Sequence, residues 1–159
     1  MIDPDRIGIY GHSQGGTLAP LVASKAPHMA FIIASAAAGL PPEQVEIYSV
    51  ENFMGVGALP SPEAGLAHEY VESLVTTAYR GLSHQRLRDL WQQVKGKPWA
   101  FEPPPEGDYW WSFSKAFAQY DPIHYWREVR SPVLLATDIL VGRPASGLRV
   151  RYQCRGLRQ

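Results

Sequence analysis

Cysteine, long apolar runs and acidic residues near the carboxyl end are all scarce in this chain of 159 residues. Cys154 is the single cysteine, so no disulfide can form between two cysteines of this sequence. No apolar run approaches the length of a membrane span, and the formal net charge is zero. Zero net charge excludes a bulk electrostatic attraction to nucleic acid or to an anionic membrane. The length and the 45% hydrophobic content suit one compact domain with its own core.

The most informative stretch is a glycine-rich sequence around one serine. Gly11, Ser13 and Gly15 have the spacing G-x-S-x-G, and His12 and Gln14 occupy the variable positions. A short apolar segment precedes them, and a helical pattern follows at once. This context is typical of a nucleophile elbow, a sharp strand-to-helix turn that leaves no room for a Cβ on either side of the serine. We predict that Ser13 is a nucleophile; the alternative is a glycine-rich turn with an incidental serine.

The expected chemistry follows from the weakness of a serine hydroxyl as a nucleophile. The hydroxyl needs a base that takes its proton and backbone donors that receive the developing oxyanion. The backbone N–H of Gln14 is the expected oxyanion-hole donor, because unpaired N–H groups at the start of a helix favour negative charge. Attack by Ser13 gives an acyl-enzyme that water later cleaves. This mechanism requires no metal and no organic cofactor.

Apolar strands alternate with helical patterns along the chain, which predicts an α/β fold with a parallel sheet and flanking helices. Three continuous apolar segments are predicted strands, each buried on both faces: residues 7–10, 29–34 and 131–136. Residues 15–26 are a predicted helix between the first two strands. Its expected buried face carries Leu18, Leu21 and Val22.

Residues 41–112 form a predicted helical insertion between the second and third strands. From residue 43 to residue 96 the pattern is helical in three segments. The apolar stripes of the second and third segments are Leu66, Tyr70 and Leu74, and Leu87, Leu90, Trp91 and Val94. These stripes predict packing faces, and the place of the insertion predicts a lid over a pocket. For Trp110 and Trp111 a place in the core is favoured over a pocket wall.

Together these features resemble the α/β-hydrolase fold family, and within it the prolyl-oligopeptidase-like and dienelactone-hydrolase-like bacterial serine hydrolases. The resemblance runs from about residue 3 to residue 135. Its segments are residues 3–8, 11–16, 19–23, 30–33, 96–99, 120–122 and 131–135. It implies that residues 1–159 are a single partial domain of this fold, containing strands five to seven of eight and a lid. It also implies a serine hydrolase acting on esters or related acyl bonds.

The catalytic set that the resemblance implies is incomplete in this sequence. Asp138 matches the family's acid if the preceding loop is shortened; the alternative is a residue of a replaced tail. The family's order is nucleophile, acid, histidine. All five histidines precede Asp138: His12, His28, His68, His84 and His124. The alternative hypothesis is therefore a catalytically incompetent fragment of such a hydrolase, with at most an interaction role.

Residues 142–159 form an atypical basic tail without resemblance to the family. No acidic residue follows Asp138, whereas five arginines do: Arg143, Arg149, Arg151, Arg155 and Arg158. An altered reading frame explains this change better than an exposed edge strand or a nucleic-acid-binding tail. The expected partners are a small ester or acyl substrate and, through an exposed sheet edge, other copies of the chain. Neither a specific nucleic acid nor a membrane is expected.

Overall fold

The computed structural model describes residues 3–136 of the chain, and this part has an α/β fold. It forms two compact units. The first unit comprises residues 3–39 and 122–136 of the described part, and the second comprises Leu40–Asp121. The predicted insertion at residues 41–112 falls within the second unit. Asp138 and residues 142–159 lie outside the described residues.

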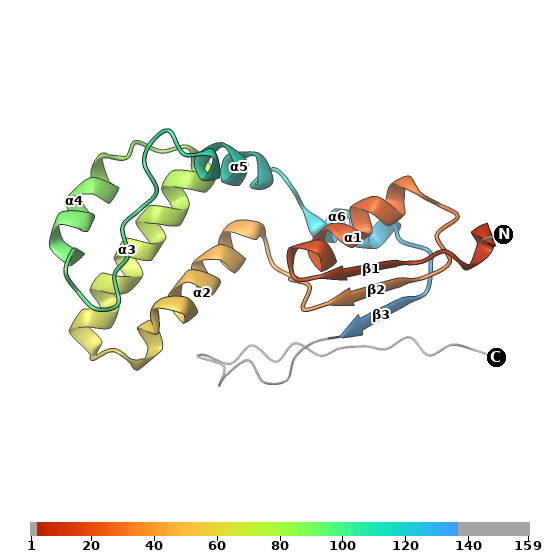
Figure 1. The fold of residues 1–159 in the computed structure, drawn as a ribbon, viewed down its shortest axis with the longest axis horizontal. Coiled ribbons are helices and arrows are strands. Elements are labelled where there is room, and N and C mark those ends of the chain that lie inside the picture. The colour runs from red at the N-terminus through yellow and green to blue at the C-terminus, as the bar shows by residue number, and fades with distance from the viewer. Residues whose placement is uncertain (1–2, 137–159) are drawn as a thin grey trace. The chain divides into compact units, whose positions relative to one another are not determined.

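The first unit is a three-stranded parallel sheet with two helices packed on one side of it (Figure 1). The strand order is β1-β2-β3, and the register places Tyr10 beside Ile33 and Ile33 beside Leu134. Its elements are η1 (Pro4–Arg6), β1 (Ile9–His12), α1 (Gln14–Lys25), β2 (Ile32–Ser35), α6 (Pro122–Glu128) and β3 (Val133–Ala136). The three predicted strands and the predicted helix between the first two are therefore present.

The buried face of α1 consists of small residues, which corrects the predicted face. Leu18 and Leu21 are only half-buried, and Val22 is 43% exposed. The buried residues are Gly16, Thr17, Ala19, Pro20 and Ala23. Because their side chains are short, α1 lies close enough to the sheet for Ile9 and Ile32 to pack against its backbone and methyl groups. Helical periodicity located a helix here, but it selected the wrong face.

The prediction that the strands are buried on both faces is wrong for β1 and β3 within the described residues. Tyr10 is 65% exposed and Leu134 is 57% exposed. These two residues share a sheet face with Ile33, because side chains alternate along each strand. The helices α1 and α6 cover the opposite face, on which Ile9 packs. A continuous apolar strand predicts that other elements pack on both faces of the sheet, but it does not identify those elements.

The helix α3 forms the centre of the second unit, with α2, α4 and α5 packed around it (Figure 1). Its elements are α2 (Pro42–Met54), η2 (Val56–Ala58), α3 (Ser61–Arg80), α4 (Gln85–Val94) and α5 (Tyr109–Phe117). The predicted stripes on α3 and α4 are confirmed, since Tyr70, Leu74 and Val94 are all buried in one core. Trp111 is also a core residue, and its indole N–H donates to the Pro105 carbonyl at 2.7 Å.

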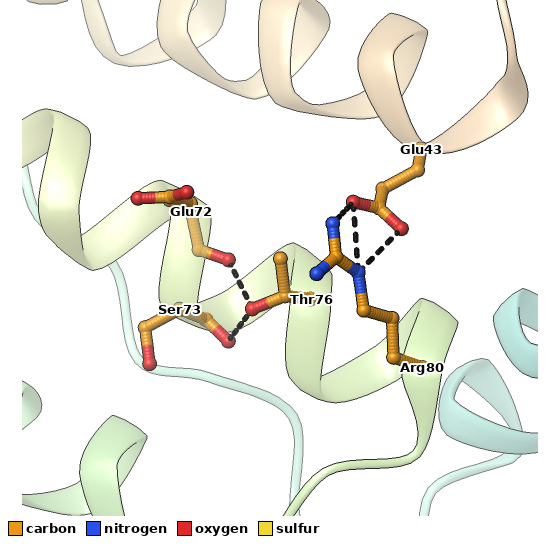
Figure 2. Close-up of polar contacts among 5 residues, drawn as sticks. All are labelled: Glu43, Glu72, Ser73, Thr76 and Arg80. Carbon is orange, nitrogen blue, oxygen red and sulfur yellow. Dashed lines mark hydrogen bonds and ion pairs between the residues drawn. The ribbon is translucent and has the colours of Figure 1, made fainter.

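Two ion pairs join α2 to α3 in addition to the apolar contacts. Arg80 donates to both carboxylate oxygens of Glu43, with Nη2 2.6 Å from Oε1 and Nε 3.1 Å from Oε2 (Figure 2). Along the same stretch of α3, the Thr76 hydroxyl donates to a main-chain carbonyl one turn earlier (Figure 2). A second pair joins His68 to Glu51. Because α2 has few fully buried residues of its own, these polar contacts help to hold it on α3.

We expect Leu74→Ala to destabilise the second unit by about 2–5 kcal/mol, because it leaves a cavity in a closed core. Leu82→Ala is the matched control, since Leu82 is 50% exposed and its truncation costs less than about 0.5 kcal/mol. Urea unfolding followed by circular dichroism gives both values. Equal losses for the two variants would contradict the assigned core.

The His68–Glu51 pair predicts a small pH-dependent stabilisation. The hydrogen bond with Glu51 raises the pKa of His68 above its ordinary 6.5, because the carboxylate favours the charged imidazole. The contribution is therefore fully present below pH 6.5 and is lost as the pH rises through the raised value. At pH 6 we expect His68→Gln to be less stable than the native chain by about 0.5 kcal/mol, as for other exposed pairs.

The difference between the native chain and His68→Gln should disappear by about pH 9, where the imidazole is neutral. Urea midpoints at the two pH values measure it. His28→Gln controls for the loss of an exposed imidazole. A His68→Gln difference that grows with pH would show that the assigned sign is wrong.

Candidate active site

Ser13 lies between β1 and α1 with an unusual backbone conformation. Its φ is 53° and its ψ is −120°. Few residues other than glycine adopt a positive φ, because the Cβ then crowds the backbone. The conformation is held on both sides: the Ser13 N–H donates to the Ser35 carbonyl at 2.8 Å, and the Ser13 carbonyl accepts from the Thr17 N–H at 3.0 Å. The turn therefore presents an exposed Ser13 side chain on a fixed backbone.

The glycines around Ser13 differ in what they permit. A Cβ on Gly11 would lie 2.2 Å from the Gly15 carbonyl oxygen, so no side chain fits there. A Cβ on Gly15 would meet nothing within 4 Å, so the predicted lack of room at Gly15 is wrong. The second crowded position is Gly16, where a Cβ would lie 3.0 Å from the Ser35 carbonyl oxygen. Gly15 lies on the solvent-exposed side of α1, whereas Gly16 is buried against the sheet.

Gln14 is the first residue of α1, where the structure places the predicted oxyanion donor. An N–H at this position has no partner within the helix. No acceptor for the Gln14 N–H is recorded among the described residues. Within residues 3–136, the first turn of α1 thus offers an N–H donor without an acceptor directly after Ser13, at the positive end of the helix dipole.

No histidine of the described part has a recorded hydrogen bond with the Ser13 side chain. The neighbouring His12 instead contacts Ser35, with Nδ1 3.3 Å from Oγ. Other described histidines have these contacts: His68 with Glu51, His84 with the ring of Trp111, and His124 with Glu128. The described part of the chain thus brings together Ser13, His12 and Gln14 but places none of its histidines against the Ser13 hydroxyl. The expected acid, Asp138, lies outside the described residues.

Ser35 and Thr17 also contact the turn at Ser13, although the sequence did not predict a role for either residue. Ser35 ends β2, and besides accepting from the Ser13 N–H its hydroxyl faces His12. The Thr17 hydroxyl donates to the Ser13 carbonyl at 3.3 Å and accepts from the Ala38 N–H at 3.2 Å. Ser35 thus joins the turn at Ser13 to the end of β2, and Thr17 joins it to Ala38, in the segment that follows β2. The available signal was a serine directly after the apolar segment at residues 29–34, since neighbouring parallel strands end at one edge of a sheet.

Comparison with known proteins finds no matching family model, curated protein or solved structure. Among residues 3–136, no cluster of three or more His, Cys, Asp or Glu side chains is arranged to hold a metal ion. No helix in that range is both long and apolar enough to cross a membrane. The geometry around Ser13 is therefore the main indication of what this chain does.

The surroundings of Gly11 and Gly15 predict opposite effects of a change to alanine at the two positions. Gly11→Ala should destabilise the first unit by about 3 kcal/mol, the upper end of the usual cost of overpacking, because the new methyl group collides with backbone. Gly15→Ala should leave it unchanged or stabilise α1 by up to about 1 kcal/mol, since alanine favours helix. Hydrogen exchange of the β1 and α1 amides measures both effects. Equal behaviour of the two variants would contradict the close contact at Gly11.

Proposed function

We propose that this chain carries the nucleophile and one oxyanion donor of a serine hydrolase that acts on esters or related acyl bonds. The supporting observation is the backbone of Ser13, which has a φ of 53° at a strand-to-helix turn. Such a conformation costs about 1–3 kcal/mol and persists only where neighbouring groups impose it, as at active sites. Here the imposing groups are the hydrogen bonds of Ser13 with Ser35 and Thr17.

In the proposed reaction the Ser13 Oγ attacks the carbonyl carbon of the substrate while a base takes the hydroxyl proton. The carbonyl electron pair moves onto oxygen, and the Gln14 N–H donates to the resulting oxyanion. Collapse of this intermediate expels the leaving group with the proton and leaves an acyl group on Ser13. Water then cleaves the acyl-enzyme by the same steps. The resemblance to the α/β-hydrolase fold family implies a histidine as the base and Asp138 as the acid that orients it.

As part of the same proposal, the first unit belongs to an α/β-hydrolase core, and the insertion at residues 41–112, within the second unit, is its helical lid. The support is the connectivity of the chain. The segment Leu40–Asp121 is inserted between β2 and β3, and the chain leaves the sheet after Ser35. Ser13 follows the carboxyl end of the neighbouring parallel strand, so the insertion begins at the edge that carries the nucleophile. Substrate choice among esters, thioesters and peptides then depends on the lid.

A second candidate function is association without catalysis. It is supported by the lack of a recorded histidine contact at Ser13 in the described part and by the exposed apolar side chains of Tyr10 and Leu134. Within that part β1 pairs only with β2, so its other edge has unpaired backbone groups. An open strand edge beside apolar side chains favours pairing with another copy of the chain.

Labelling with a fluorescent fluorophosphonate, which reacts with activated serines, distinguishes the two functions. We expect label on the tryptic peptide 7–25 and at least about 100-fold slower labelling of that peptide in Ser13→Ala. Ser24→Ala is the matched control on the same peptide, because the Ser24 hydroxyl is occupied by the Leu21 carbonyl at 2.8 Å. A folded sample without label on this peptide would exclude Ser13 as an activated nucleophile and leave association as the function.

A further inference from the structure

The imidazole beside the candidate nucleophile faces a different serine. His12 and Ser35 are register partners at the carboxyl ends of β1 and β2. The His12 Nδ1 lies 3.3 Å from the Ser35 Oγ. The His12 side chain is exposed and Ser35 is half-buried, so a reagent can reach the pair from solvent. Both residues lie on the sheet face that carries Tyr10, opposite the face that α1 covers.

We propose that Ser35 and His12 form a second nucleophile–base pair, which accepts acyl or phosphonyl groups from activated donors independently of Ser13. In the tautomer with the proton on Nε2, the His12 Nδ1 has a free lone pair directed at the Ser35 hydroxyl. The Ser35 proton passes to Nδ1 as Oγ bonds to the phosphorus or carbonyl carbon. The leaving group, fluoride or a phenolate, departs with its bonding electron pair.

The backbone fixes Ser35 as firmly as it fixes Ser13. The Ser35 carbonyl accepts from the Ser13 N–H at 2.8 Å, and the next N–H, of Ala36, donates to the Ala136 carbonyl at 2.8 Å. Ala36 has a φ of 51°, so the chain turns sharply directly after Ser35, as it does at Ser13. No other serine of the described part has a recorded hydrogen bond with a histidine.

The reactivity of this pair is limited by what surrounds His12. No carboxylate is recorded against the His12 ring within residues 3–136, so the imidazole lacks the orienting group of a complete triad. We therefore infer that the pair reacts with strongly activated donors, such as aryl esters and fluorophosphonates, and not with unactivated esters or amides.

The test identifies the serine that a fluorophosphonate labels in the full chain. Trypsin separates Ser13, on peptide 7–25, from Ser35, on peptide 26–80. We expect label on Ser35, its loss in Ser35→Ala and at least about tenfold slower labelling in His12→Gln, because an amide accepts a hydrogen bond but takes no proton at neutral pH. Ser49→Ala is the matched control, an exposed serine on the same peptide. It should label like the native chain.

His12→Asn provides a second variant without a base, and circular dichroism confirms that each variant is folded. Labelling of Ser35 at the native rate in folded His12→Gln or His12→Asn would overturn the role of His12 as base. Label on Ser13 alone would overturn this pair and support the proposed function. Label on Ser35 alone would support the pair and count against Ser13, and no label on either peptide would overturn both.

Discussion

The close approach of Gly11 to the first turn of α1 is the constraint on which the first unit depends. Because a Cβ at this position would lie 2.2 Å from the Gly15 carbonyl oxygen, only glycine lets β1 end and α1 begin within so short a turn. The turn forces Ser13 to a positive φ and directs its N–H to Ser35, so β2 is fixed beside β1 at the same point. The small residues along α1 extend this close contact over the sheet.

The second unit is stabilised in a different way. Large side chains from several helices fill its core, in which the Tyr70 hydroxyl donates to the Phe101 carbonyl at 2.7 Å. Burial raises the pKa of the Tyr70 hydroxyl, which therefore stays neutral as a donor. A core of this kind tolerates changes of side chain that conserve volume. The turn at Ser13, by contrast, tolerates no side chain at Gly11. The first unit therefore depends on one exact backbone contact, whereas the second unit depends on the total volume of its apolar core.

The order and type of most elements could be predicted from the sequence. Apolar periodicity, and the glycine and proline residues that end helices and strands, depend only on nearby residues. The buried face of α1 could not be predicted, because it depends on how closely the helix lies to the sheet. The contact between His12 and Ser35 depends on strand register, which periodicity within one strand does not determine. Of the predicted site, Ser13 and Gln14 are in the described part, whereas Asp138 lies outside it.

The insertion of Leu40–Asp121 between β2 and β3 also has a consequence for biosynthesis. The hydrogen bond from the Ser131 hydroxyl to the Met29 carbonyl joins residues 102 positions apart, and the register of β2 with β3 pairs residues that are similarly distant in sequence, such as Ile32 and Val133. The second unit is continuous in sequence and is complete before β3 leaves the ribosome. Domains emerging from the ribosome fold as units in chain order. During synthesis the edge of β2 that β3 will occupy therefore stays open until the helical unit has been made.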